Sequence, residues 1–550
     1  MPNLCPCWSD LTDINVITPL KLSLDNWFEA NEINTSDLPE GAVAVMNPAN
    51  HQEIIGFHHH HSKDDMLAMI DTAQTAFVSW SQTPVTERAA LLCRVADILE
   101  RHTDELIALC IKEAGKVAQD GIDEVREAVD FCRYYAVVLC ISPWNFPLAI
   151  FLGQVAAAIA TGNTVLAKPA EQTSLIALRT IELMKYVGLP EGVVQAVIAR
   201  GSEVGNVIIP DARIQTVMFT GSTETGTIIS QTLADRGGDQ VPLIAETGGQ
   251  NCMIVDSTAL PEQVVDDVIS SGFQSAGQRC SALRVLFLQE DIADDVITML
   301  KGALAELHVG NPEYLSTDIG PVIDQKALSA LNAHSDYMKT NGKLLYQCTL
   351  GEEITNNLAE NEHFFFAPRL YEIDDISVLK KEVFGPCVHV VRFKGNDIEA
   401  VVDKINGTGF GLTMGIHTRI EHRAFELAKL SRAGNVYINR NMIGATPDAE
   451  QFNLLPAQVE ALDGDSQSDA ESVLFMDIAN AAEKAWRLTE LNNRISCVRQ
   501  LLAKIAHVGI VDDLAEDLNR TLTSARSQLI DIEKRMKKPT FLPGPTGESN

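Results

Sequence analysis

Short apolar runs alternate with amphipathic segments from residue 137 onward, and this alternation most constrains the fold. The runs are bounded by turns, which indicates buried strands, at 137–142, 163–168, 193–198 and 216–220. Apolar residues at helical spacing lie between and after them, at 148–161, 173–187, 202–209 and a helix opening at 221–226. Strand and helix in alternation, joined by short turns, predict a parallel sheet covered on both faces. Nucleotide binding is typical of such sheets, although a fold alone does not establish it.

A second α/β pattern follows Glu246. Its strands are expected at 251–256, 284–288, 387–393 and 434–439, and its helices at 262–271 and 292–307. Before the first pattern we expect a turn leading into a strand at 47–56 and helices at 63–80, 85–115 and 118–135. These patterns divide the chain into an extended arm (1–40), a nucleotide-binding domain (41–245), a catalytic domain (246–445) and an acidic linker with long helices at 475–506 and 512–537 (446–550).

Charge and composition exclude several classes of function. A net charge of −31 argues against nucleic-acid binding, which needs a concentrated basic face. The longest apolar stretch, 136–160, is interrupted by Pro143, Asn145 and Pro147, so no membrane span of about 20 apolar residues is expected. Eleven cysteines without framework spacing, and no signal peptide, indicate a cytoplasmic protein.

No metal site is expected from the sequence. Cys5 and Cys7 have no second pair of ligands at zinc-site spacing. The four histidines at 58–61 are interpreted as an exposed turn or loop.

Cys280 is the candidate nucleophile. It lies in F-Q-S-A-G-Q-R-C-S-A-L-R at 273–284, where small and polar neighbours leave room for a substrate at the sulfur. Glu246 precedes it by 34 residues, ends an apolar run and is followed by two glycines. A thiol and a carboxylate together indicate covalent catalysis with a water-activating base, whereas Cys280 alone would more often be a structural thiol.

Two motifs in the first pattern are candidates for binding a nucleotide. F-T-G-S-T-E-T-G at 219–226 follows a strand and opens a helix, where main-chain N–H groups and the Ser222 hydroxyl can meet a phosphate. Lys168 ends a strand and Glu171 follows three residues later, a pair that suits the hydroxyls of an adenosine ribose. Each motif also has a structural interpretation, an ordinary turn for the first and a strand-end ion pair for the second.

Three further residues lie in short segments with a candidate role. The Asn145 amide, in P-W-N-F-P, is able to donate to an oxyanion, although Asn also occurs in turns for structural reasons. Glu382 and Phe384, in E-V-F-G-P, suit a sugar hydroxyl beside a flat ring, or equally a strand-end turn.

In this order, P-W-N-F-P, K-P-A-E-Q-T-S, F-T-G-S-T-x-x-G, E-T-G-G-Q-N, G-Q-R-C-S and E-V-F-G-P resemble the aldehyde dehydrogenase superfamily. D-F-C-R-Y-Y-A, Y-I-N-R-N-M-I-G-A and the terminal L-P-G-P-T-G-E are similar to bacterial proline utilization A, in its L-glutamate γ-semialdehyde (pyrroline-5-carboxylate) dehydrogenase region. The resemblance covers about residue 47 to the end. It implies NAD-dependent oxidation of an aldehyde, with a Rossmann-type sheet and an α/β catalytic domain.

The resemblance also implies roles for single residues. Cys280 attacks the aldehyde, Asn145 and the Cys280 main-chain N–H hold the oxyanion, and Glu246 activates water. The residues implied to bind NAD are Trp144, Lys168, Glu171, Gly221, Ser222, Gly226, Glu382 and Phe384. The Glu171 carboxylate would repel a 2′-phosphate, which favours NAD over NADP. Those implied to contact the substrate are Ser281, which would bind its far carboxylate, with Glu127 and Phe146.

The sequence departs from the family pattern in two places. The hairpin that usually follows Ala136 and reaches a neighbouring subunit is missing. Its absence leaves undecided whether the chain forms the usual homodimer, and it predicts an exposed sheet edge. T-P-D-A-E follows Ala445 where the family has a glycine-rich substrate anchor. The proline dehydrogenase barrel is also missing, and the last residues resemble the start of a linker, so a separate proline dehydrogenase partner is a further expectation.

These departures keep three alternatives open. The chain is either the active dehydrogenase, or an NAD-binding remnant with little turnover, or a dehydrogenase for another semialdehyde. Separately, the region from 446 is interpreted either as a packing element or as an interaction module.

Overall fold

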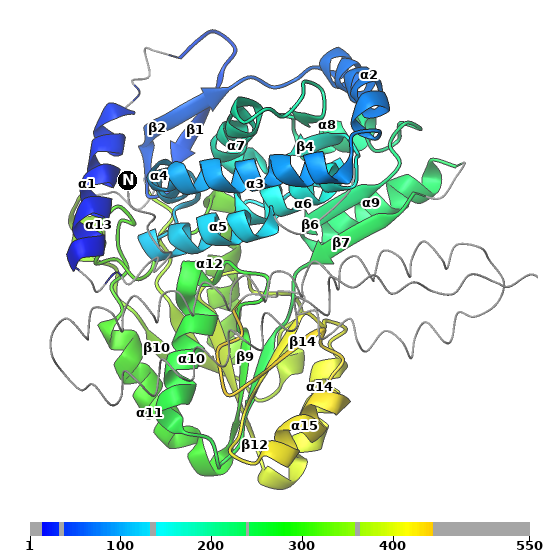
Figure 1. Ribbon diagram of the computed structural model, residues 1–550. Coiled ribbons are helices and arrows are strands. Elements are labelled where there is room, and N and C mark those ends of the chain that lie inside the picture. Colours follow the sequence, from blue (N-terminus) through cyan, green and yellow to red (C-terminus); the bar gives the residue numbers. More distant parts are fainter. Residues whose placement is uncertain are drawn as a thin grey trace, which may run out of the picture. The chain divides into compact units, whose positions relative to one another are not determined.

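Two β-sheets with helices on their faces organise the chain (Figure 1). The computed structural model describes residues 11, 14–31, 33, 38–132, 139–237, 241–357 and 363–443, all within one compact unit, Trp8–Ala445. The linker from 446, the helices expected at 475–506 and 512–537, and the shortened connection after Ala136 lie outside the described residues.

The first sheet has five parallel strands in the order β5-β4-β3-β6-β7. Their bounds are β3 Leu139–Ile141, β4 Val165–Lys168, β5 Val194–Ala196, β6 Val217–Gly221 and β7 Leu243–Thr247. The first strand along the chain, β3, lies in the middle, with β4 and β5 on one side and β6 and β7 on the other. The strand order therefore reverses between β3 and β6, which is where sheets of this kind bind ligands.

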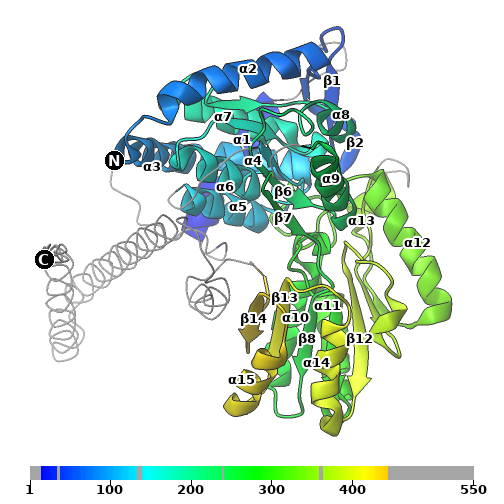
Figure 2. The ribbon, with the colours of Figure 1, turned by 90° about the vertical axis from the view of Figure 1, so that its right-hand side faces the viewer.

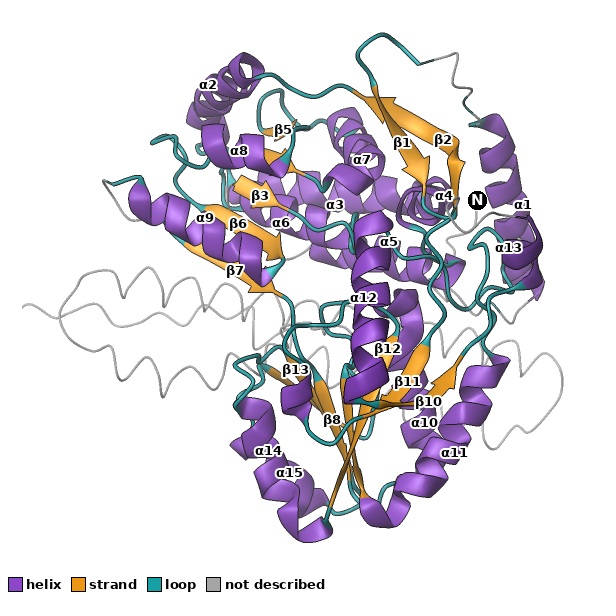
Figure 3. Ribbon diagram, turned by 180° about the vertical axis from the view of Figure 1, so that it is seen from behind, coloured by secondary structure: helices purple, strands orange, loops and turns teal. Residues whose placement is uncertain are grey.

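Helices cover both faces of this sheet, because successive side chains of its strands point to opposite sides. Cys140, Val165 and Ala167 pack into one apolar core, and Leu139 and Leu166 into another. The helices are α2 Lys63–Trp80, α3 Val85–Arg101, α4 Thr103–Ala114, α5 Ala118–Phe131, α6 Ala149–Ala160, α7 Ser174–Tyr186, α8 Gly201–Val207 and α9 Thr223–Asp235. Figure 3 shows α8 and α9 in front of the strands, and α3 and α6 behind them.

The second sheet has seven strands in the order β10-β11-β12-β9-β8-β13-β14, parallel except that β10 runs antiparallel to β11. Figure 2 shows it in the lower half of the view. The strands are β8 Cys252–Val255, β9 Val285–Gln289, β10 Lys343–Gln347, β11 Arg369–Glu372, β12 Cys387–Phe393, β13 Thr413–His417 and β14 Asn435–Ile438. The helices are α10 Pro261–Phe273, α11 Glu290–Glu306, α12 Gln325–Asn341, α13 Glu352–Asn357, α14 Ile398–Asn406 and α15 Glu421–Leu430.

The predicted α/β fold with parallel sheets is confirmed. Each strand expected between residues 137 and 288 corresponds to a strand of the structure, namely β3, β4, β5, β6, β8 or β9. Periodicity identified these elements because their apolar residues are buried on both faces of a sheet. The first sheet ends at Thr247 and the second begins at Cys252, so Glu246 stands on the last strand of the first sheet.

The extended arm predicted for residues 1–40 is wrong where the structure describes it. Helix α1 spans Ile14–Ala30, and β1 Val43–Asn47 pairs with β2 Asn50–His58 in an antiparallel hairpin. Leu20 and Leu24 of α1 are buried in the same core as α4. Pro19 inside the helix argues against helix formation locally, so tertiary packing stabilises α1 where propensity does not.

Two other local predictions are corrected. The single helix expected at 85–115 is two, α3 and α4, which meet at His102, where the backbone leaves the helical region (φ −106°, ψ 20°). No proline or glycine marks that break in the sequence. The histidines at 58–61 do not form an exposed loop throughout, since His58 ends β2 and is buried.

No helix among the described residues combines the length and apolar character needed to cross a lipid bilayer.

Candidate active site

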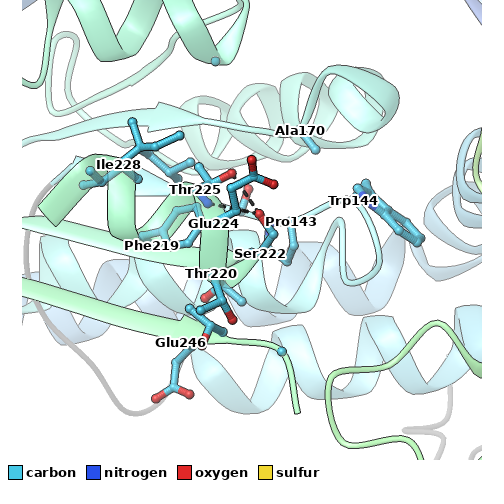
Figure 4. A pocket seen from close by; sticks show the side chains of 18 of the residues that line it. Pro143, Trp144, Ala170, Phe219, Thr220, Ser222, Glu224, Thr225, Ile228 and Glu246 are labelled. Atoms are coloured by element: carbon cyan, nitrogen blue, oxygen red, sulfur yellow. Dashed lines mark hydrogen bonds between the residues drawn. The ribbon is translucent and has the colours of Figure 1, made fainter. Parts of the chain in front are cut away.

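A cavity of about 1140 Å³ opens at the carboxyl ends of the strands of the first sheet, where the strand order reverses. Segments that follow β3, β4, β6 and β7 line it, and Cys280, Glu382 and Phe384 reach it from the second sheet's part of the chain. Figure 4 shows Trp144 on one side of this cavity and Ile228 on the other. The cavity therefore collects residues that are far apart in sequence around the ligand crevice of a parallel sheet.

Lys168 and Glu171 both line the cavity, beside the end of β4. Lys168 is buried, and burial lowers the pKa of its ammonium group. The negative charge of Glu171 acts in the opposite direction but is the smaller effect. The Glu171 carboxylate accepts a hydrogen bond of 2.9 Å from the Gly201 main-chain N–H, which fixes its position. A cation and an anchored carboxylate next to each other suit the hydroxyl groups of a ribose.

The N-terminus of α9 faces the cavity. Ser222 caps this helix, and its hydroxyl accepts from the Thr225 main-chain N–H at 3.2 Å (Figure 4). The free N–H groups of the first turn make a helix start suitable for a phosphate. Gly221 lines the cavity, but Gly226 is buried in α9 and does not. An added Cβ at Gly221 would stand 2.7 Å from the Phe219 ring, so packing requires this glycine.

Two aromatic rings meet in the cavity. Trp144, after β3, lies edge-on to Phe384, with ring centroids 5.5 Å apart. Glu382 lines the same cavity, and burial raises the pKa of its carboxyl, although the nearby charge of Arg284 acts in the opposite direction. An added Cβ at Gly248 would stand only 1.8 Å from Glu382 Oε2, so this glycine gives the carboxylate its space.

Cys280 lies in a segment with unusual backbone geometry. Ser275, Ala276 and Gly277 have positive φ angles of 52°, 52° and 65°, a region that costs a non-glycine residue about 1–2 kcal/mol. Such geometry persists only where surrounding contacts enforce it. The Asn251 amide supplies two of them, because it donates to the carbonyls of Cys280 at 2.6 Å and Ala282 at 3.0 Å.

Burial and nearby carboxylates determine the protonation of the Cys280 thiol. Burial first, and then the negative charge of Glu382, raise its pKa to about 11, with Glu127 and Glu246 acting in the same direction. The thiol is therefore protonated at neutral pH, whereas the thiolate is the form of a cysteine that acts as a nucleophile.

Glu246 is exposed on β7 and lines the same cavity as Cys280. Although the residue is exposed, its carboxyl is partly shielded from water, and this desolvation raises the pKa of the carboxyl toward the range of a general base. In Figure 4 its carboxylate points away from Ser222 and Thr225.

Asn145 is buried and also lines this cavity. Its amide nitrogen donates to the Gln278 carbonyl at 3.0 Å, two residues before the thiol. An amide nitrogen carries two hydrogens, so the second is left to meet an oxyanion.

The three residues expected to bind substrate do not line the cavity. Ser281 is 2% exposed, and its carbonyl accepts from the Thr413 hydroxyl at 3.3 Å. The Phe146 ring lies 4.9 Å from the Lys116 ammonium and 5.5 Å from the Arg279 guanidinium. Burial raises the pKa of Glu127 to about 7, with the Glu124 charge adding to it.

Asn251 and Arg284 hold the site together, and sequence reasoning assigned them no role. Both lie in motifs quoted for other residues, Asn251 at the end of E-T-G-G-Q-N and Arg284 at the end of the cysteine segment. Only their positions next to the nucleophile's backbone distinguish them, which no local pattern shows. Among the described residues, no cluster of three or more His, Cys, Asp or Glu side chains is arranged to hold a metal ion.

Comparison with known proteins agrees with this geometry. The Aldehyde dehydrogenase family matches residues 35–138 and 136–453. The chain is 42% identical to the bifunctional protein PutA of Escherichia coli over 92% of its length, but it spans only 40% of that protein. It is 34% identical to the 1-pyrroline-5-carboxylate dehydrogenase of Anoxybacillus flavithermus, over 74% of the chain and 84% of that protein.

Solved structures give the same result. A variant of Thermus thermophilus 1-pyrroline-5-carboxylate dehydrogenase superposes with a TM-score of 0.73 at 27% identity, over 81% of the chain and 92% of that structure. A bifunctional proline utilization A structure superposes with a TM-score of 0.69 at 40% identity, over 78% of the chain and 43% of that structure. With a family match over most of its length, the chain belongs to the aldehyde dehydrogenase family.

Proposed function

We propose that the chain is an NAD-dependent dehydrogenase that oxidises L-glutamate γ-semialdehyde, the open form of 1-pyrroline-5-carboxylate, to L-glutamate. The observation that carries the proposal is one cavity lined by a thiol, a carboxylate and an amide, Cys280, Glu246 and Asn145. The substrate is proposed from the similarity to 1-pyrroline-5-carboxylate dehydrogenases.

The residues of the cavity fit NAD. Lys168 and Glu171 would hold the adenosine ribose, the start of α9 with Ser222 the pyrophosphate, and Glu382 the nicotinamide ribose beside Phe384 and Trp144. The crevice of about 1140 Å³ is larger than most small-molecule sites, as a dinucleotide requires. When bound, NAD accepts the hydride that leaves the aldehyde carbon.

The protein's own groups divide the remaining chemistry. The Cys280 thiol gives its proton to solvent water and the sulfur bonds to the aldehyde carbon, while the second Asn145 N–H and the Cys280 main-chain N–H stabilise the oxygen that becomes negative. Loss of hydride leaves a thioester on Cys280. Glu246 takes a proton from water, which attacks the thioester carbon, and the carbon–sulfur bond breaks to release the acid and restore the thiol.

The cellular setting is part of the proposal. The substrate would come from a reaction that oxidises proline, supported by the similarity to bifunctional PutA proteins. A cytoplasmic location is supported by the acidic composition and the scattered cysteines of the sequence.

The test is to incubate the purified full chain with pyrroline-5-carboxylate and NAD and to follow NADH absorbance. We expect NADH to form with the unaltered chain and to fall to background with Cys280→Ala. A signal no higher than that of Cys280→Ala contradicts the proposal. Faster oxidation of succinic semialdehyde than of the five-carbon compound contradicts the substrate assignment.

A further inference from the structure

Arg284 is the largest fully buried side chain among the described residues, with 0% of its surface exposed. A buried guanidinium must be paired and hydrogen-bonded, because leaving such a charge unpaired away from water is expensive. Its partners therefore show what it does.

The guanidinium joins two separate segments of the cavity wall. Nη1 donates to the carbonyl of Gly277 at 2.6 Å and to that of Gly385 at 3.2 Å. Nη2 donates to the carbonyl of Arg279 at 3.0 Å and to Glu382 Oε1 at 3.3 Å. Two of these acceptors belong to the segment that ends at the Cys280 thiol, and two belong to 382–385, which includes the Glu382 carboxylate and the Phe384 ring.

The backbone of the segment before Cys280 has a conformation that needs such hydrogen bonds to hold it. Three successive residues, 275–277, have left-handed backbone geometry, and two of them are not glycine. The backbone at Gly385 packs so closely that an added Cβ at Gly277 would lie 2.3 Å from its carbonyl oxygen. Bonds from Arg284 to both carbonyls hold this close contact.

The charge of Arg284 is balanced at the same place. Glu382 is its ion-pair partner, at 3.3 Å, and the guanidinium also lies over the Phe384 ring, 5.1 Å from the centroid. A cofactor that contacts Glu382 and Phe384 thus contacts two groups that Arg284 holds in place. Arg284 therefore links these two groups to the backbone before the thiol.

The main chain of Arg284 is itself anchored by His389. The Arg284 carbonyl accepts from the His389 main-chain N–H at 2.9 Å and from His389 Nδ1 at 3.0 Å. A carbonyl only accepts, so Nδ1 carries the proton, and Nε2 of the neutral ring accepts from His334 Nε2 at 2.9 Å. Neither histidine lines the cavity.

We propose that Arg284 is a positioning residue that locks the nucleophile segment, 275–280, to the cofactor segment, 382–385, so that cofactor binding and thiol reactivity are coupled. The coupling rests on the function proposed above. Cys280 alkylation is measured without substrate turnover, so it tests the coupling separately from the proposed activity.

The principal variant is Arg284→Lys, which keeps the charge but cannot donate to four oxygens in a fixed fork. We expect the KM for NAD to rise and kcat to fall, each by about tenfold, as for the loss of hydrogen bonds to charged groups. NAD should change the rate of Cys280 alkylation by iodoacetamide in the unaltered chain, and this effect should largely disappear in Arg284→Lys. Glu382→Gln should raise the KM for NAD strongly in the unaltered chain and by less than about threefold in the Arg284→Lys background.

Controls separate positioning from general loss of structure. Arg88→Lys is matched, because Arg88 is also buried and donates to main-chain carbonyls, at Ala160 and Thr83, away from the cavity. It should leave all these readouts within about twofold. Mass spectrometry of alkylation compares Cys280 with exposed Cys93 and buried Cys252. Reactive Cys252 in Arg284→Lys would indicate unfolding.

If Arg284→Lys unfolds, His389→Leu tests the proposal in its place. This substitution removes the side-chain donor to the Arg284 carbonyl, and residue 389 does not line the cavity. We expect it to raise the KM for NAD at least threefold and to weaken the effect of NAD on Cys280 alkylation. The proposal is overturned if folded Arg284→Lys keeps both the KM for NAD and the effect of NAD on Cys280 alkylation within twofold. If Arg284→Lys does not fold, the same result in folded His389→Leu overturns it. If the unaltered chain forms no NADH but Arg284→Lys still loses the NAD effect on Cys280, the proposed activity fails while the coupling stands.

Discussion

At the scale of single residues, the site combines a partly buried thiol with several carboxylates. Glu246 and Glu382 line the cavity with Cys280, and Glu127 adds its negative charge from outside the lining. Each disfavours a negative charge on the sulfur, so the Cys280 thiol stays protonated at neutral pH.

The raised pKa of Cys280 predicts how it reacts with iodoacetamide. Without NAD, the rate at Cys280 should increase about tenfold per pH unit from pH 7 to pH 10, since only the thiolate reacts and the pKa is about 11. Glu382→Gln removes a negative charge and should shift this profile to lower pH. Peptide mapping by mass spectrometry measures it, and a plateau below pH 9 would contradict the prediction.

Glu171 predicts the preference between cofactors. Glu171→Gln keeps an acceptor for the Gly201 N–H but loses the charge that would repel a 2′-phosphate. We expect the ratio of kcat/KM for NADP to that for NAD to rise about tenfold, which corresponds to about 1.4 kcal/mol. Glu224→Gln, at the start of α9, serves as a control carboxylate of the same cavity. Equal changes in both variants would argue against a specific role for Glu171.

At the scale of elements, the nucleophile segment is the part whose conformation its own residues do not favour. Ser275 and Ala276 have left-handed geometry, and Arg284, Asn145 and Asn251 bind the carbonyls of the residues that follow them, Gly277, Gln278 and Cys280. The strained segment lies between α10 and β9, two regular elements that fix its ends.

A matched pair of glycine variants tests this account. Gly277→Ala should lose most activity and several kcal/mol of unfolding free energy, because its φ is +65° and the new Cβ would lie 2.3 Å from the Gly385 carbonyl. Gly302→Ala, in helix α11 with nothing within 4 Å of its added Cβ, should be neutral or stabilise by up to about 1 kcal/mol. Urea unfolding and initial rates compare the two. Similar losses in both variants would contradict the argument.

At the scale of the whole molecule, buried neutral histidines make stability depend on pH. Burial first, and then the His334 ring, lower the pKa of His389 to about 3, whereas its pKa in the unfolded chain is about 6.5. Below pH 6.5 the unfolded chain therefore binds a proton that the folded chain does not, so stability falls as pH drops toward 3.

His389→Gln should make this dependence shallower. We expect the loss of unfolding free energy between pH 7 and pH 5 to be smaller by about 2 kcal/mol than in the unaltered chain. Denaturant unfolding at both pH values measures it, with exposed His422→Gln on α15 as the control. An unchanged difference in His389→Gln would show that this ring does not contribute.

The sequence by itself determined most elements between residues 63 and 307, and the family. Buried strands such as 163–168 and helices such as 63–80 are visible because their burial pattern repeats along the chain. The motifs around Lys168, Ser222, Glu246 and Cys280 are local, so their order could be read before any contact was known.

Only the tertiary structure decided what depends on distant partners. Helix α1 forms because Leu24 has a core to enter, despite Pro19. Gly226 lies outside the cavity, as do the three residues expected to bind substrate, because strand ends and helix faces select which side chains reach it. Arg284 is tied into the site by its hydrogen bonds to oxygens of Gly277, Arg279, Glu382 and Gly385. Glu382 and Gly385 are about 100 residues away in sequence. No local sequence pattern marks the packing that brings them to Arg284.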